Sequence, residues 1–133
     1  MDRELIREKT MHMVYQMEAN GEFDFTKLNP VDEDANALSK KQAVATLEAL
    51  RDNKDAVDEM IRRNLDNWSF DRVAKTDLAI LRTAVTEMMY IDSVPRSVSI
   101  NEAVKLSKKF SDDKSYAFVN SVLSKVDKCL EDA

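Results

Sequence analysis

Glycine and proline are almost absent from this chain, and their scarcity constrains the fold more than any other feature. The 133 residues include one glycine and two prolines, while alanine, leucine, lysine, glutamate and methionine are common. Tight β-turns need glycine or proline at defined positions, whereas the common residues here favour helix interiors. The length also matches the usual size of one domain. The sequence therefore predicts a single all-α domain over residues 1–133.

The first third of the chain contains two segments with apolar residues at helical spacing. One helix is expected over Arg3–Asn20, because Gly21 suits the position just past a helix end. A second helical region is expected over Asn29–Arg51, with Pro30 at its first helical position and a break near Asn36. The acidic segment between these regions is the longest connection in the chain.

The middle of the chain predicts two further helices. Asn53 is a suitable N-cap for one of them, and a second apolar stripe runs over 78–88 and ends before Pro95. The buried face of the helix that follows Asn53 is expected to consist of Val57, Met60, Ile61, Leu65 and Trp68.

Two more helices are expected after Pro95. Ser99 and Glu102 have the spacing of a capping box, with Ser97 as an alternative cap. Ser111, Asp112 and Asp113 are interpreted together as the cap of the final helix. The residues expected to point inward are Ile100, Ala103, Val104 and Phe110 in one helix and Val119, Val122, Leu123, Val126 and Leu130 in the other.

About six helices with short connections each have one apolar face to bury. The sequence therefore predicts two packed three-helix subbundles, over about 1–67 and about 68–133.

The charge distribution limits the classes of partner. The net charge of −5 argues against a protein that coats nucleic acid by bulk electrostatics. The balance is −5 over Glu18–Asp34 and +3 over Arg96–Lys128, so the C-terminal third is better suited to face an anion. No signal peptide and no apolar stretch of membrane-spanning length is visible, and a cytoplasmic protein is expected.

Residues typical of an active site are lacking in the sequence. His12 is the only histidine, Cys129 is the only cysteine, and no glycine-rich phosphate loop is present. We therefore expect no enzymatic activity, no metal and no cofactor. Cys129 is interpreted as a small buried hydrophobic residue and His12 as a solvated or helix-packing one.

Several motifs resemble the NusB family of bacterial transcription antitermination factors. The resemblance spans nearly the whole chain and is most specific in the C-terminal half. The matching elements are Trp68 with Arg72, the segment AILR over 79–82 leading to Glu87, INEAV over 100–104 with Lys108, FVN over 118–120 with Val122 and Leu123, and, more weakly, REKTMHMVYQ over 7–16.

The resemblance implies both a fold and a function. Proteins of this family have two helical subbundles, pair with the ribosomal protein NusE, and bind a boxA element in nascent RNA. They thereby help RNA polymerase to read through terminators and support ribosomal RNA synthesis. Some relatives form homodimers through the surface that otherwise serves a partner.

The resemblance also assigns RNA-binding roles. In the N-terminal helix, Arg3 and Arg7 match positions that supply arginines to RNA, Glu4 stands where a further base is common, and Lys9 is a possible addition. Tyr15 matches a family aromatic near RNA, although burial statistics alone favour the core for it.

In the C-terminal half, Phe118 matches a second aromatic near RNA, and Lys114 lies one helical turn before it. Family members often have an acidic residue where Lys114 stands and a glycine where Ser121 stands, so this chain adds a base beside the ring.

Two acidic residues match positions that the family uses against NusE. They are Asp77 and Glu87, and for Glu87 a solvated helix-face role is equally compatible with the sequence. Arg82 and Glu102 are interpreted as a structural pair that fixes the angle between two late helices.

Three hypotheses follow. The first is an RNA-binding antitermination adaptor that works with NusE. The second is a helical protein-interaction module of the same fold that has lost RNA recognition, suggested by the acidic balance and the sparsely basic N-terminal helix. The third is a fragment of an RNA methyltransferase; this chain alone, lacking a cofactor loop, is expected to have no transferase activity.

Overall fold

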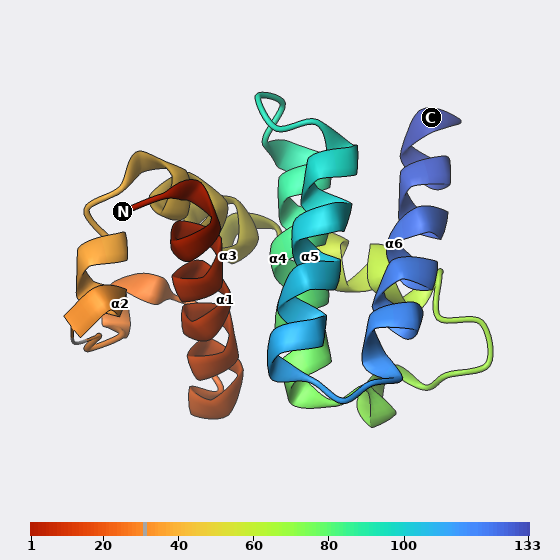
Figure 1. The fold of residues 1–133 in the computed structure, drawn as a ribbon, viewed down its shortest axis with the longest axis horizontal. Helices are drawn as coiled ribbons and strands as arrows, with labels where there is room; N and C mark the ends of the chain where they lie inside the picture. The colour runs from red at the N-terminus through yellow and green to blue at the C-terminus, as the bar shows by residue number, and fades with distance from the viewer. Residues whose placement is uncertain (31) are drawn as a thin grey trace.

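The computed structural model describes residues 1–30 and 32–133, and over that part of the chain it contains no strand. Figure 1 shows α1 to α3 grouped on one side and α4 to α6 on the other, which confirms the all-α fold of two three-helix subbundles. No described helix has the length and apolar character needed to cross a membrane. The elements are α1 (Arg3–Asn20), η1 (Phe25–Lys27), α2 (Asp32–Ala37), α3 (Lys41–Arg62), η2 (Phe70–Arg72), α4 (Lys75–Tyr90), α5 (Arg96–Phe110) and α6 (Ser115–Glu131).

Helix α1 has the predicted limits. The Asp2 carboxylate accepts a hydrogen bond of 2.8 Å from the Leu5 N–H and caps the start. Gly21 has a φ of 73°, in the left-handed region, and its N–H donates to the Glu18 carbonyl. The predicted break near Asn36 is also confirmed, since α2 ends at Ala37. Helix α2 begins at Asp32, so the predicted helical start at Pro30 is wrong, and residue 31 between them lies outside the described residues.

Helix α3 differs from the prediction at Asn53. The helix runs through this residue, which has a φ of −133° and a ψ of 26°, and the Asn53 amide donates to the Ala49 carbonyl at 2.9 Å. Asn53, which the sequence predicts as a helix cap, therefore lies at a kink within one helix. Because α3 ends at Arg62, Trp68 lies in the following loop and is 58% exposed, so its prediction as a core residue is wrong.

Helix α4 lies at the centre of the molecule. It packs against α1 and α3 in one subbundle and against α5 and α6 in the other. Residues 77–88 are all buried, including the predicted stripe and also Ile80 and Ala84 on other faces. A helix covered from both sides buries nearly its whole circumference. The two subbundles therefore share α4 as a common wall.

The start of α5 also differs from the prediction. The helix begins at Arg96 directly after Pro95, so Ser99 lies inside it and caps nothing. Phe110, expected inside, is 38% exposed at the end of the helix. In α6 four residues of the predicted apolar stripe are buried and Leu130 is partly buried. Of the predicted cap, Asp112 accepts hydrogen bonds from the Lys114 and Ser115 N–H groups.

A buried ion pair joins α3 to α4. The Arg82 guanidinium donates from Nε and Nη2 to the two carboxylate oxygens of Asp58 at 2.8 and 3.1 Å, and from Nη1 to Glu18 of α1 at 3.1 Å. The guanidinium also lies 4.6 Å from the ring centroid of Phe23. The predicted pairing of Arg82 with Glu102 is wrong, because Glu102 lies beside Lys105 instead.

Asp58 is held in its charged form. Burial by itself raises the pKa of its carboxyl, but hydrogen bonds and positive charge from Arg82, and then from Lys54, outweigh burial and hold that pKa below its ordinary value. The ion pair is therefore intact at neutral pH.

Replacing Asp58 by alanine is expected to lower the free energy of unfolding by about 3 to 5 kcal/mol, because it leaves the Arg82 charge buried without its main partner. Urea denaturation of the purified protein measures this loss. Glu22→Ala serves as the control, since it breaks the exposed Lys27–Glu22 pair and should cost less than about 1 kcal/mol. Equal effects of the two variants would contradict the assigned role of Asp58.

The depressed pKa of Asp58 predicts that the free energy of unfolding depends on pH. Because the folded-state pKa of Asp58 is depressed, its contribution to stability is present above the ordinary aspartate pKa of about 3.9 and is lost as pH falls through the folded value. The free energy of unfolding should therefore fall less steeply below about pH 5 in Asp58→Asn than in the unchanged protein. Urea titrations at a series of pH values test this, and parallel curves would contradict it.

Candidate nucleic-acid interface

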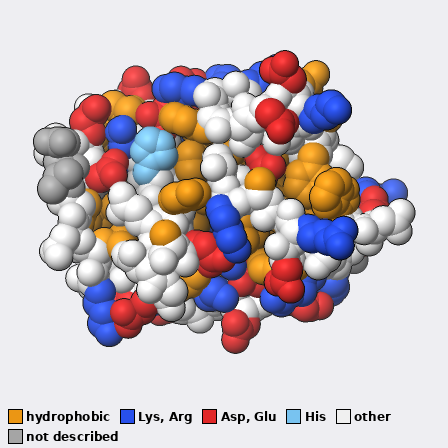
Figure 2. Space-filling model, turned by 90° about the horizontal axis from the view of Figure 1, so that it is seen from below, with side chains coloured by type: hydrophobic (Ala, Val, Ile, Leu, Met, Phe, Trp, Pro, Cys, Tyr) orange, Lys and Arg blue, Asp and Glu red, His pale blue; other side chains and the backbone are white. Residues whose placement is uncertain are grey.

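One end of the molecule gathers three of the six predicted RNA-binding residues, Tyr15, Lys114 and Phe118. The C-terminal half of α1, the start of α4, the end of α5 and the start of α6 meet at this end. Figure 2 views it directly and shows exposed hydrophobic side chains (orange) in two places, one beside the histidine (pale blue) and one further along beside basic side chains (blue). Two pockets lie at this end, named here after Tyr15 and Trp68.

The Tyr15 pocket lies between α1, α2, α4 and α5, and its walls include His12, Asp34, Thr76 and Phe110. Tyr15 is 42% exposed, so the alternative that places it in the core is wrong. The rings of His12 and Phe110 meet edge to face, with centroids 5.1 Å apart. Burial, and next the charge of Lys9, lower the pKa of His12, which keeps the imidazole neutral at physiological pH. The aromatic rings that line this pocket, including the His12 imidazole, therefore carry no formal charge.

The Trp68 pocket lies between the loop after α3 and the start of α6. Its walls include Trp68, Arg72, Lys114 and Phe118, so the predicted pair of Lys114 and Phe118 does share one concave site. The rings of Trp68 and Phe118 are packed together, with centroids 5.8 Å apart and planes at 60°. Aromatic faces beside basic side chains are the ordinary means of binding unpaired bases.

The first turn of α4 separates the two pockets. Thr76 lines the Tyr15 pocket, and its neighbour Asp77 lines the Trp68 pocket. Asp77 is buried, and its two carboxylate oxygens accept hydrogen bonds from the Ser111 and Ser115 hydroxyls at 2.7 and 3.0 Å. Asp77 thus ties the α5–α6 connection to α4 at the floor of a pocket.

Arg7 and Glu87 form a second buried ion pair. The Arg7 Nε lies 3.0 Å from Glu87 Oε1, and the two residues are only 7% and 4% exposed. The solvated role considered for Glu87 is therefore wrong. Burial raises the pKa of Glu87, and the Arg7 charge with hydrogen bonds from Arg7 and Ser99 offsets this only in part. The pair holds α1 against α4, and both side chains already have a structural partner.

The remaining predicted residues of α1 differ in exposure. Arg3 is exposed, whereas the Lys9 side chain is only 15% exposed, with its ammonium 3.8 Å from the Glu8 carboxylate. The acids Glu4 and Glu8 pair with Lys105 and Lys109 of α5 at 2.8 and 2.6 Å. Arg3 lies about 18 Å along the helix axis from Tyr15, at 1.5 Å per residue. The structure therefore does not bring Arg3 into either pocket.

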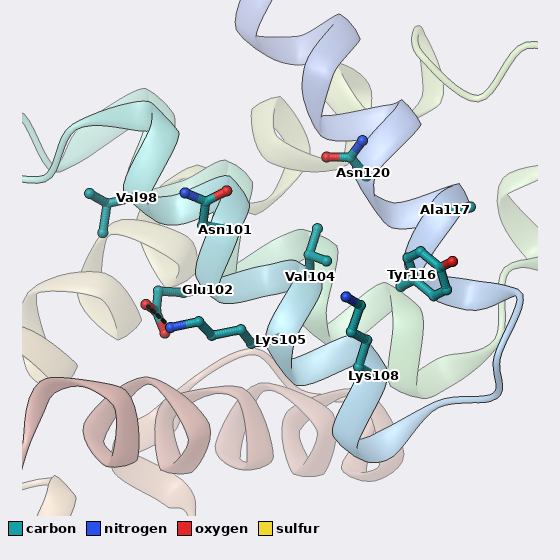
Figure 3. A pocket seen from close by; sticks show the side chains of 9 residues that line it. All are labelled: Val98, Asn101, Glu102, Val104, Lys105, Lys108, Tyr116, Ala117 and Asn120. Atoms are coloured by element: carbon teal, nitrogen blue, oxygen red, sulfur yellow. Dashed lines mark hydrogen bonds and ion pairs between the residues drawn. The ribbon is translucent and has the colours of Figure 1, made fainter.

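A shallow groove between α5 and α6 contains none of the predicted RNA-binding residues. Figure 3 shows it open between Val98, Val104 and Tyr116, with the Lys105 side chain reaching Glu102. The ammonium of Lys108 lies 4.9 Å from the Tyr116 ring centroid. No cluster of three or more metal-ligating side chains occurs among the residues that the structure describes.

Sequence reasoning missed the other aromatic and basic residues of the two pockets, which are His12, Trp68, Arg72 and Phe110. A signal existed for Trp68 and Arg72, because both belong to the family motif, but the apolar spacing assigned Trp68 to the core. No comparable signal existed for Phe110, since its exposure depends on where α5 ends.

The fold and this end of the molecule define a class of protein: two three-helix subbundles with exposed aromatic side chains set beside basic ones. The sequence model of the NusB family matches residues 4–128, and the chain belongs to that family. It is 41% identical to the transcription antitermination protein NusB of Bacillus licheniformis, over 98% of this chain and all of that protein. A Bacillus cereus protein of the same name is 39% identical over 95% of this chain and 97% of its own length.

Solved structures agree with this assignment. The NusB structure from T. maritima superposes with a TM-score of 0.84 at 27% identity, covering 96% of this chain and 92% of that one. A NusB chain crystallised with NusE and double-stranded RNA has a TM-score of 0.78, covers 96% of each chain and, at 22% identity, supports the fold alone.

Arg7→Met is expected to lower the free energy of unfolding by about 3 to 5 kcal/mol, because it leaves the Glu87 carboxylate buried without its partner. Arg3→Met, at an exposed position, should change it by less than about 0.5 kcal/mol. Urea denaturation measures both. The double variant Arg7→Met/Glu87→Leu should recover most of the loss, and its RNA affinity then tests the predicted RNA contact of Arg7 separately from its packing role. Equal stability of Arg7→Met and Arg3→Met would contradict the structural assignment.

Proposed function

We propose that this protein is a cytoplasmic transcription antitermination factor that binds boxA-type RNA as a heterodimer with the ribosomal protein NusE. In this role it is an adaptor and catalyses no reaction. Its complex with RNA and NusE joins the RNA polymerase antitermination complex, helps the polymerase to read through terminators and supports transcription of ribosomal RNA.

The observation that carries the proposal is the pair of aromatic pockets at one end of a NusB-family fold. Single-stranded RNA is bound chiefly by stacking of splayed bases on aromatic side chains and by cations beside the phosphates. Tyr15 and Phe118 supply rings, and Lys114 supplies a cation, on surfaces from both subbundles. Arg3 and Lys9 extend the basic contacts along α1.

Charge explains why a partner is needed. The protein has a net charge of −5, and the acids of α1 pair with lysines of α5, so few cations remain for phosphates. Affinity for RNA depends strongly on the number of phosphates neutralised. We propose that NusE contributes the missing cationic surface. Asp77 and Glu87 are both buried, so we propose that they support the NusE-binding surface indirectly: Asp77 holds Ser111 and Ser115, and Glu87 holds α1 through Arg7.

The alternative function is a helical protein-interaction module without RNA recognition. It is favoured by the acidic balance and by the burial of Arg7, one of the three bases of α1. The two functions differ in whether RNA binds with sequence preference when NusE is present.

Fluorescence anisotropy with labelled boxA RNA tests the proposal, with and without NusE. We expect boxA RNA to bind more tightly than a scrambled sequence, and NusE to strengthen that binding. Lys114→Ala should weaken it and reduce the slope of log K against log salt by about 0.7, the value for one phosphate of a single strand. Lys41→Ala, at an exposed lysine of α3, is the matched control and should leave the slope unchanged. Absence of any boxA preference in either condition would leave the interaction module as the function.

A further inference from the structure

Trp68 is the most exposed large hydrophobic side chain among the residues that the structure describes, at 58%. It is held at this exposed position, because the loop that carries it is anchored on either side. The Trp68 N–H donates to the Leu65 carbonyl, and the following turn η2 is succeeded directly by Val73, which is buried. An apolar ring of this size fixed in contact with water is characteristic of a binding surface.

The ring of Trp68 packs against one other aromatic ring, and more than half of the residue's surface is exposed. Phe118 is half-buried at the start of α6, and its ring lies at 60° to the indole plane, with centroids 5.8 Å apart. The two rings line a pocket of about 350 Å³. A flat ligand stacked on the indole would therefore meet the Phe118 ring at an angle, in the edge-to-face arrangement that aromatic pairs favour.

The charges of this pocket favour an anionic ligand. Its two acids are already used by the protein, since Asp77 accepts from the Ser111 and Ser115 hydroxyls and Asp112 caps α6. Its two bases, Arg72 and Lys114, form no ion pair with any described residue. The side chains left available for a ligand are thus two aromatic faces and two cations, which suits a nucleotide better than an apolar peptide segment.

We propose that Trp68 is an RNA-binding residue: its indole and the Phe118 ring hold one unpaired base of single-stranded RNA, with Arg72 and Lys114 beside the adjoining phosphates. The inference rests on the proposed function and adds to it a specific base-stacking residue. RNA binding would also explain why Trp68, the most exposed aromatic among the described residues, lines a pocket together with two basic side chains, Arg72 and Lys114, that form no ion pair.

Trp68 is the only tryptophan of the chain, so its intrinsic fluorescence reports on the pocket directly. Titration of the unchanged protein with boxA RNA, without NusE, should change this fluorescence in a saturable way. The midpoint should agree with that from anisotropy of labelled RNA under the same conditions. Stacking of a base on the indole is the physical cause of the expected change.

Substitutions give a second readout. Trp68→Ala should weaken RNA binding by roughly fivefold to a hundredfold, the range that corresponds to one stacked base, and Trp68→Phe should weaken it less. Phe118→Ala should also weaken RNA binding. This loss of RNA affinity should be larger than the effect of the substitution on the stability of the fold. Tyr116→Ala is the matched control, because Tyr116 is a similarly exposed aromatic of α6 outside this pocket. These affinities are measured at saturating NusE, and circular dichroism melting confirms that each variant is folded.

The outcomes separate this inference from the proposed function. RNA binding without a fluorescence change, with Trp68→Ala as tight as the unchanged protein, overturns the inference and leaves the function intact. A loss of NusE binding in Trp68→Ala, with RNA affinity of the protein alone unchanged, overturns it in favour of a protein contact. Failure of the unchanged protein to bind boxA RNA in any condition overturns both.

Discussion

The buried ion pair between Arg82 and Asp58 is the constraint on which the arrangement of the helices depends. A guanidinium inside the protein must be matched by carboxylates at fixed positions, so α3 and α1 have little freedom to slide along α4. The Arg7–Glu87 pair applies the same constraint further along α4. Together the two pairs fix the first subbundle against the wall that both subbundles share.

The packing of the helices on α4 also sets the geometry of the candidate interface. Tyr15 belongs to α1 and Phe118 to α6, and only the common packing on α4 sets the distance and angle between their pockets. The charge distribution also depends on helix packing. The acids of α1 pair with lysines of α5 and are therefore neutralised instead of facing a ligand. An acidic protein can in this way still expose aromatic rings beside cations.

Sequence reasoning was most successful where local chemistry decides the outcome. Gly21 ends α1 as predicted, Asp112 of the predicted cap accepts backbone hydrogen bonds at the start of α6, and most of the predicted apolar stripe of α6 is buried, because caps and helical periodicity depend on neighbouring residues only. It was least successful at helix ends set by packing. Asn53 has the chemistry of a cap, yet the core contacts on both sides of it carry α3 through as a kinked helix, and the earlier end of that helix moves Trp68 to the surface.

The sequence by itself determined the all-α class, the number of helices, the NusB resemblance and several residues of the interface, since composition, periodicity and motifs are properties of the linear chain. Only the tertiary structure decided which charged residues are internal. Arg82 pairs with Asp58 rather than Glu102, and Arg7 is buried against Glu87, because a charge finds its partner by proximity in space across separations of 24 and 80 residues. The exposure of Trp68 beside Phe118 was decided in the same way, by two segments that meet only in the folded protein.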